Sequence, residues 1–159
     1  MDSQTINQQL IHTFYTAFAQ KDYASMQQCY ADNAVFNDEV FVNLNSAQVK
    51  AMWEMLCTRG KDLKLVHSGV SATESGANAY WEAAYTFTST KRKVVNRIHS
   101  QFEIENGKIV RHTDRFNFYA WAKQAFGAVG VLLGLTSYFK NKVRKGAGES
   151  LKAFMESRK

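Results

Sequence analysis

The chain has no proline among its 159 residues and only two cysteines. Without proline it has no proline-rich linker or ligand motif. Cys29 and Cys57 are too few for a disulfide scaffold, and neither stands in a CxxC pair or in a Cys/His pattern with metal-ligand spacing. We therefore expect two reduced, buried thiols.

A signal sequence and a membrane span are also missing. Asp2 stands where a secretory signal needs basic residues, and polar residues interrupt the apolar positions that follow. The apolar run 125–139 is short and broken by three glycines, so it does not predict a membrane span. We expect a cytoplasmic protein. With 45% hydrophobic and 13% aromatic residues, the chain can form one sizeable core.

Positive charge is confined to one end of the chain. The net charge is +6, yet residues 1–118 contain equal numbers of acidic and basic side chains, so the whole excess lies in residues 119–159. We therefore predict a core domain over 1–118 and a basic extension over 119–159. Aromatic and basic residues are segregated, which argues against nucleic-acid binding. No GxGxxG or metal-spacing motif is present, and we expect no cofactor and no metal.

Helical periodicity appears three times in the first 60 residues. Ile6, Leu10, Phe14 and Phe18 recur every four residues and predict a helix over 3–20. Asp22 can cap a second, short helix before a strand-like run. Asn45 and Ser46 can begin a third helix. Its apolar positions are Val49, Met52, Trp53 and Leu56, and Gly60 can end it.

From Leu63 onward the period changes to two, which is typical of strands. Turns are predicted at 74–76, at the basic segment 91–93 and at Asn106-Gly107, the strongest hairpin signal in the chain. The order of elements predicts an α+β fold, with helices packed on one face of a curved antiparallel sheet.

Three segments carry a resemblance to a known family: the helix end 15–18, the segment 30–36 and the hairpin 102–109. They resemble the SnoaL-like, ketosteroid-isomerase-like branch of the nuclear transport factor two-like superfamily, over roughly residues 6–118. The resemblance implies a cone-shaped antiparallel sheet with three N-terminal helices on its concave face. It also implies a mostly apolar pocket for a small organic molecule and cofactor-free isomerase, cyclase or hydratase chemistry. The alternative is a non-catalytic binding or dimerisation module, because one fold hosts many functions.

The resemblance assigns candidate catalytic residues. Asp38 matches the general base of the ketosteroid isomerases, or it simply caps a turn. In the ketosteroid isomerases the first hydrogen-bond donor of the oxyanion hole stands at the position that corresponds to Phe14 here, and phenylalanine cannot donate a hydrogen bond. Their second falls on His99 or on Ser100, depending on the strand register, and a slip of one residue reverses the face.

His112 and Asp114 are two residues apart on a predicted strand and share a face with Phe116. Asp114 matches the acid/base aspartate of the SnoaL-like cyclases and limonene epoxide hydrolases, and His112 would act as its acid or orienting partner; a buried structural pair is the alternative. The epoxide hydrolases also need an Arg-x-Asp pair, whereas this chain has Arg97-Ile98-His99. That departure argues against epoxide hydrolysis.

Five aromatic residues are candidates to line the pocket, although such residues are more often core. They are Phe14, Tyr15, Trp53, Phe102 and Phe116.

The extension contains two predicted helices, one over 118–126 and a final one with an apolar stripe. The stripe consists of Phe139, Val143, Ala147, Leu151 and Met155. The extension can cover the mouth of the cone as a lid, pack in a homodimer or lie on an anionic membrane surface. We favour a lid or a homodimer over the membrane surface, because basic helix faces are usually solvated.

Overall fold

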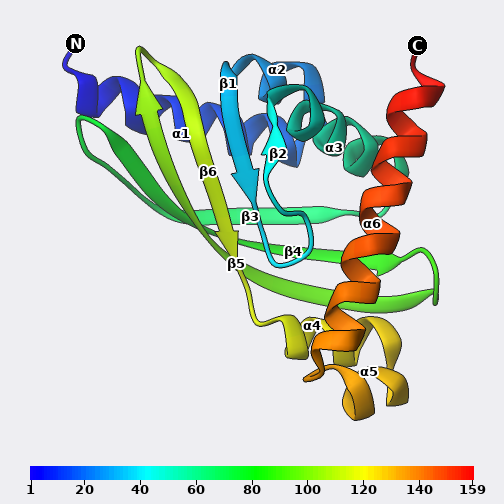
Figure 1. The fold of residues 1–159 in the computed structure, drawn as a ribbon. Helices are drawn as coiled ribbons and strands as arrows, with labels where there is room; N and C mark the ends of the chain where they lie inside the picture. Colours follow the sequence, from blue (N-terminus) through cyan, green and yellow to red (C-terminus); the bar gives the residue numbers. More distant parts are fainter.

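The computed structural model describes residues 1–159 and shows a curved sheet with helices on its concave side and at its open end (Figure 1). The elements in chain order are α1 (Ser3–Ala19), α2 (Tyr23–Gln28), β1 (Tyr30–Asn37), β2 (Leu44–Asn45), α3 (Ser46–Arg59), β3 (Lys64–Ala72), β4 (Gly76–Phe87), β5 (Arg92–Glu105), β6 (Lys108–Arg115), α4 (Phe118–Phe126), α5 (Ala128–Leu133) and α6 (Ser137–Ser157). None of these helices has both the length and the apolar composition needed to cross a bilayer.

The three N-terminal helices begin where their capping residues predict. Asp2 accepts a hydrogen bond from the Thr5 amide, and Asp22 accepts one from the Ser25 amide. Asn45 forms a reciprocal capping box with Gln48 at the start of α3. These contacts satisfy amides that the first helical turn leaves without a partner.

The sheet has the strand order β2-β1-β6-β5-β4-β3. Asn106 and Gly107 turn the chain between β5 and β6 with φ of 51° and 71°, as the hairpin signal predicts. The α+β class with N-terminal helices on a curved sheet is confirmed. The sheet is mixed rather than wholly antiparallel, because β1 pairs in parallel with β6. The chain leaves the sheet through α3 after β2 and returns at the far edge as β3, so β1 and β6 meet as non-consecutive neighbours.

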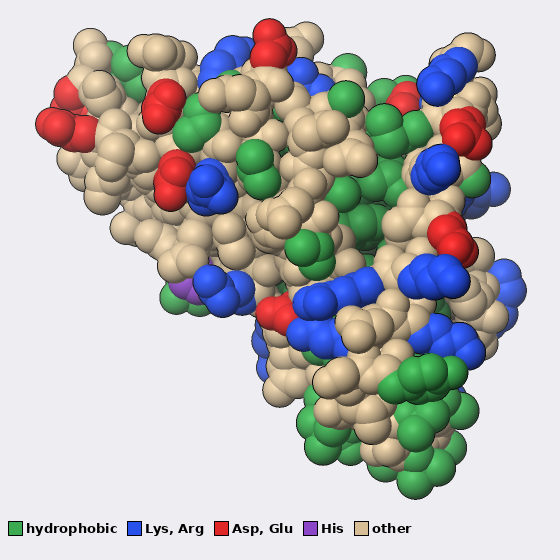
Figure 2. Space-filling view, viewed as in Figure 1, with side chains coloured by type: hydrophobic (Ala, Val, Ile, Leu, Met, Phe, Trp, Pro, Cys, Tyr) green, Lys and Arg blue, Asp and Glu red, His purple; other side chains and the backbone are tan.

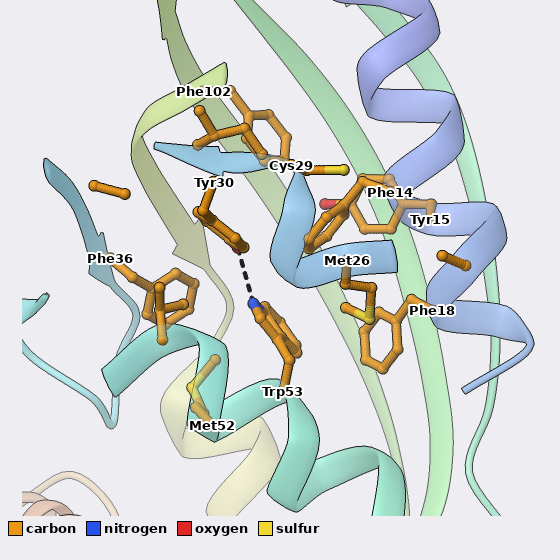
Figure 3. Packing of buried hydrophobic residues seen from close by; sticks show 14 of the residues in the cluster. Phe14, Tyr15, Phe18, Met26, Cys29, Tyr30, Phe36, Met52, Trp53 and Phe102 are labelled. Carbon is orange, nitrogen blue, oxygen red and sulfur yellow. Dashed lines mark hydrogen bonds between the residues drawn. The ribbon is translucent and has the colours of Figure 1, made fainter. Parts of the chain in front are cut away.

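The larger hydrophobic cluster, here called the deep cluster, lies between α1, α3 and the sheet. Aromatic side chains dominate it, and Figure 3 shows how they fill the space. Its largest members with no more than 2% exposure are Phe14, Tyr15, Phe18, Phe36 and Trp53. Cys29 and Cys57 are buried free cysteines, and burial raises the pKa of each thiol to about 11.

The smaller hydrophobic cluster, here called the mouth cluster, lies where α4 and α6 cover the other end of the sheet. Its buried members are Val94, Phe118, Trp121, Ala122, Ala125 and Phe139. From there α6 runs along the molecule to α3 (Figure 1), where Leu151 and Phe154 join the deep cluster. The proposed boundary after residue 118 falls inside α4, whose cap is Asn117.

Candidate functional site

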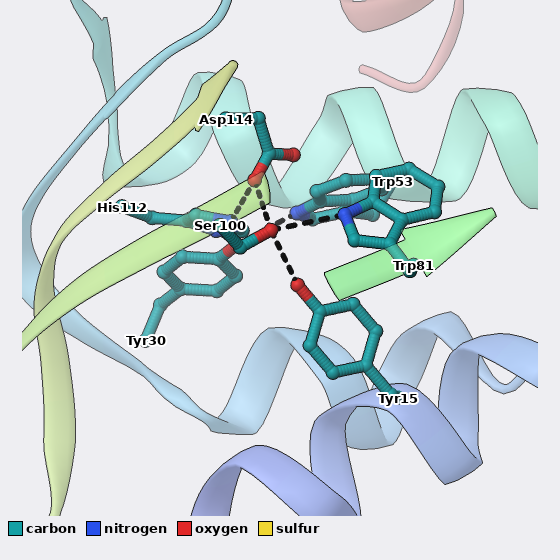
Figure 4. A network of polar contacts seen from close by, with 7 residues as sticks. All are labelled: Tyr15, Tyr30, Trp53, Trp81, Ser100, His112 and Asp114. Atoms are coloured by element: carbon teal, nitrogen blue, oxygen red, sulfur yellow. Dashed lines mark hydrogen bonds and ion pairs between the residues drawn. The ribbon is translucent and has the colours of Figure 1, made fainter. Parts of the chain in front are cut away.

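A closed set of hydrogen bonds crosses the interior at Ser100 of β5 (Figure 4). The Ser100 hydroxyl accepts bonds from the Tyr15 hydroxyl at 2.7 Å and from Trp81 Nε1 at 2.9 Å, and it donates to Asp114 Oδ1. These three contacts use both lone pairs of Ser100 Oγ and its single proton. Burial raises the pKa of Tyr15 well above its usual value, so this phenol stays a neutral donor.

His112 joins the same carboxylate from β6. Its Nε2 lies 2.7 Å from Asp114 Oδ1, and its Nδ1 lies 2.8 Å from the Tyr30 hydroxyl. Trp53 Nε1 donates to that hydroxyl, so Tyr30 can place its own proton only on His112 Nδ1. These contacts are satisfied when His112 Nε2 donates to Asp114, which then accepts from both His112 and Ser100.

Aromatic rings enclose His112 completely, and its side chain has 0% exposure. Phe102 lies 4.2 Å and Phe36 lies 4.9 Å from the imidazole, centroid to centroid, and Phe14 and Trp53 close the remaining sides. Four of the five aromatic side chains that we proposed as pocket walls, Phe14, Tyr15, Trp53 and Phe102, therefore fill the deep end of the cone. His112 orients Asp114 rather than facing an open cavity.

The second carboxylate, Asp38, follows the last residue of β1. Asn37 of β1 pairs with Thr113 of β6, and Asp38 and Asp114 are the residues that follow this last pair. The two carboxyl groups are near enough for the Asp114 charge to raise the pKa of Asp38. Asp38 Oδ1 accepts from the amides of Val40 and Phe41 at 2.7 and 2.6 Å, which is the turn-capping role. This leaves Asp38 Oδ2 without a hydrogen bond.

Asp114 has the same division between its two oxygens. Oδ1 accepts two bonds, while Oδ2 has none and is drawn in Figure 4 without a contact. Every fully buried side-chain nitrogen and oxygen in the protein has a partner. The free oxygens of Asp114 and Asp38 must therefore each retain some accessible surface. Two neighbouring carboxyl groups thus each present one unbonded oxygen.

Burial gives Asp38 an unusual proton affinity. It raises the pKa of the carboxyl to about 7, the two amide bonds lower it, and repulsion from Asp114 and Glu39 raises it further. A carboxyl with this pKa can both accept and donate a proton near neutral pH.

Polar groups continue from the carboxylates toward the mouth cluster. Tyr85 accepts a bond from Trp121 Nε1 at 2.8 Å, which leaves its own hydroxyl proton free. Burial raises the pKa of Tyr85, and the Asp38 charge adds to this. Asn96 alternates with Ile98 and Ser100 along β5, is half-buried and has no side-chain hydrogen bond. Phe116 packs at the edge of the mouth cluster.

Two surface hollows lie away from these groups. One lies on the outer side of α1 and α2, lined by His12, Thr13, Thr16, Ala17, Gln20, Asp22 and Ser25. The other lies beside the Asn106-Gly107 turn. No group of three or more histidine, cysteine or acidic side chains is arranged to hold a metal ion.

The family model described as SnoaL-like domain matches residues 11–112, which include β1 with Asp38 after it and reach His112. The chain belongs to the SnoaL-like family. No curated protein sequence matches it.

Solved structures confirm the fold of this SnoaL-like protein. An M. tuberculosis LEH-like epoxide hydrolase has a TM-score of 0.63 and 15% identity, over 84% of this chain and 98% of that one. A protein of Silicibacter sp. tm1040 named as a candidate polyketide cyclase has a TM-score of 0.66 and 20% identity, over 76% and 95%. TsrD from Streptomyces laurentii has a TM-score of 0.65 and 16% identity, over 77% and 96%.

The structure does not bring His99 to the site. His99 stacks on Tyr80 at 4.6 Å and lies 3.2 Å from Asn78 Oδ1, on the outer face of the sheet. The register places Ser100 opposite Asp114, so Ser100 is the inward residue of the two alternatives. Arg97 also lies on the outer face, paired with Glu82 at 2.9 Å. The Asp-Arg-Asp arrangement that we expect of an epoxide hydrolase is therefore absent.

Sequence reasoning missed Tyr85 and Asn96 as site residues. Both could have been found from alternation, because Tyr85 shares a strand face with Trp81 and Asn96 shares one with Ser100. The residues that surround Tyr85 and Asn96 could not be predicted, because they depend on how α4 covers the sheet.

Proposed function

We propose that this SnoaL-like protein binds a small apolar organic molecule beside Asp38 and Asp114 and transfers a proton on it without a cofactor. The observation that carries the proposal is the pair of adjacent carboxyl groups, each fixed through one oxygen and free at the other. Isomerisation, cyclisation and hydration are all compatible with a carboxyl group that takes up and returns a proton. Neighbours named as an epoxide hydrolase and a polyketide cyclase support chemistry on an organic molecule.

Each polar group has a distinct role in this proposal. Asp38, with a pKa of about 7, removes or returns the proton. Asp114 is the second carboxylate and is held in place by Ser100 and His112. The free hydroxyl proton of Tyr85 can donate to negative charge that develops on a substrate oxygen.

In this proposal the extension acts as a lid, because it contacts the loop that carries Asp38. α6 is tied to the Asp38 loop by two contacts of Glu39. Lys140 pairs with its carboxylate at 2.7 Å, and Arg144 donates to its carbonyl at 3.0 Å. Both are half-buried surface contacts, which are individually weak and can open.

Native mass spectrometry of the purified protein, followed by denaturing extraction, tests the proposal. We expect an apolar molecule to copurify with the wild type and to remain bound in Asp38→Asn, because the amide preserves the turn. With that molecule as substrate, Asp38→Asn and Asp114→Asn should each lose turnover, while the control Asp32→Asn, at an exposed position of β1, keeps it. Full turnover in Asp38→Asn would contradict the proposed base.

A non-catalytic module is the second candidate, favoured by the aromatic side chains that fill the deep end of the cone. It predicts an empty protein whose mass corresponds to a homodimer, with no ligand in the extract. Binding without turnover would also support this candidate.

A further inference from the structure

One end of the molecule is a convex tip of exposed apolar side chains. Figure 2 shows them gathered below the body of the protein, at the end where Figure 1 places α5. The apolar tip consists of Val129, Val131, Leu132, Leu133, Leu135 and Tyr138. Leu132, Leu135 and Tyr138 are 78%, 80% and 71% exposed. A soluble domain rarely leaves such a contiguous apolar surface without a partner.

Close packing of glycines fixes the shape of the tip. Gly130 is the only buried residue of α5. A Cβ on Gly130 would lie 2.0 Å from the Ala122 carbonyl oxygen, and one on Gly134 would lie 2.3 Å from the Gly130 carbonyl oxygen. Gly127 turns the chain between α4 and α5 with φ of 60°. The small residues pack inward, and the large apolar ones are held outward.

A basic collar borders the tip and carries no compensating charge. The 16 residues 124–139 contain no charged side chain, and basic residues stand at 123 and 140. The collar comprises five exposed residues that form no ion pair. They lie in the β4–β5 turn, at the start of β5, in α4 and in α6: Lys91, Arg92, Lys123, Lys142 and Lys145. Figure 2 shows blue side chains beside the tip.

Two contacts fix parts of the collar against the tip. Arg92 Nε donates to the Gln124 carbonyl at 2.8 Å, which places its guanidinium beside Gly127. The Lys123 ammonium lies 4.7 Å from the centre of the Tyr119 ring, and the hydroxyl of that ring donates to the Val131 carbonyl. Positive charge therefore surrounds an apolar projection.

We infer that the apolar tip inserts into the surface of an anionic membrane while the basic collar contacts the lipid headgroups. Insertion of leucine and valine side chains combined with lysine–headgroup attraction is the usual mode of interfacial binding. A convex tip suits a deformable bilayer. A symmetric contact with a second copy would bring two uncompensated basic collars together, and nucleic acid offers no counterpart to exposed leucine side chains.

Vesicle flotation with the full chain tests this inference. The probes are vesicles of phosphatidylcholine alone and vesicles of two parts phosphatidylcholine to one part phosphatidylglycerol. We expect the wild type to float with the anionic vesicles, to stay behind with the neutral ones and to be released by salt. Failure of the wild type to bind the anionic vesicles would overturn the inference.

Matched variants locate the contact. The double variant Leu132→Ser/Leu135→Ser should lose at least about tenfold in partitioning, because each inserted leucine side chain contributes hydrophobic free energy. Lys142→Gln/Lys145→Gln should lose on the order of tenfold or more, because each lysine near an anionic surface adds attraction. The control Val66→Ser/Val95→Ser replaces exposed apolar residues of the sheet and should bind as the wild type does.

Two results would contradict the location. One is loss of binding in the Val66/Val95 control with the tip variants unaffected. The other is light scattering in which the Leu132/Leu135 variant turns a dimer into a monomer, which would make a second copy the occupant of the tip. Far-ultraviolet circular dichroism checks that each variant is folded, and all six substituted positions are exposed.

Discussion

The deep end and the mouth of the cone are built from the same strands but differ in how their polar groups are satisfied. In the deep end, Ser100, His112 and Tyr30 use their hydrogen-bonding capacity on protein partners within a shell of aromatic rings. At the mouth, Asp38 and Tyr85 keep a free oxygen or a free proton. The first arrangement holds parts of the fold together, and the second leaves hydrogen-bonding capacity unused.

Asp114 connects the two regions. Its Oδ1 completes the deep network, and its Oδ2 forms no hydrogen bond and, like Asp38 and Tyr85, keeps unused hydrogen-bonding capacity. A chemistry-bearing carboxylate can thus be held rigidly by residues that never contact a ligand. Of the roles that the sequence leaves open for His112, acid, orienting partner or member of a buried pair, its enclosure by aromatic rings favours the last two.

The largest expected effect is on the packing of the deep cluster. Trp53→Ala should lower the free energy of unfolding by about 3–5 kcal/mol, because it leaves a cavity and removes the donor to Tyr30. Phe116→Ala, at the half-buried edge of the mouth cluster, should cost much less. Urea denaturation measures both. If both variants lost the same free energy of unfolding, the deep cluster and the mouth cluster would not differ in their contribution to stability.

A smaller loss is expected when the deep network is broken without a cavity. Ser100→Ala leaves the Tyr15 hydroxyl and the Trp81 indole N–H without an acceptor, which should cost about 2–3 kcal/mol. Ser89→Ala, at an exposed position after β4, is the control and should cost nothing measurable. A Ser100 variant as stable as the wild type would show that the network contributes no stability.

The pH dependence of stability tests the mouth. The pKa of Asp38 is raised from 3.8 to about 7, so the folded state binds more protons than the unfolded state between these values. Its stabilising contribution is complete below the unfolded pKa and is lost as the pH rises through about 7. Asp38→Asn should flatten this part of the pH–stability curve, measured by urea denaturation. An unchanged curve would contradict the raised pKa.

The smallest effect concerns the lid. Glu39→Gln removes the carboxylate that pairs with Lys140 and should cost about 0.5 kcal/mol, as expected for a partly exposed ion pair. Amide hydrogen exchange in α6 should accelerate at the same time. Exchange that accelerates equally in α1 would point to global destabilisation instead of lid opening.

Much of the fold could be predicted from local sequence signals. Asp2, Asn45 and the Asn106-Gly107 turn act within a few residues of the chain, and the structure places the corresponding helices and hairpin as they predict. The parallel pairing of β1 with β6 could not be predicted, because it joins segments about 75 residues apart and no local signal specifies it.

For the candidate site, the family resemblance assigns Asp38 and Asp114. The parallel pairing of β1 with β6, which ends at Asn37 and Thr113, one residue before each of them, could not be predicted. His99 was not excluded, because a shift of one residue in register reverses its face. The enclosure of His112 by aromatic rings could not be predicted either, because it depends on how Phe14 and Trp53 pack from two helices that are far apart in the sequence.

The most direct test of the account is the titration of the Asp38 carboxyl, followed by carbon NMR in the wild type and in Asp114→Asn. We expect the Asp38 carboxyl to titrate with a midpoint at about pH 7 in the wild type and at a lower pH in the variant, because the repulsion from Asp114 is removed. A wild-type midpoint near the ordinary value of 3.8 would contradict it, because Asp38 would then be a solvated turn residue and not a proton-transfer group.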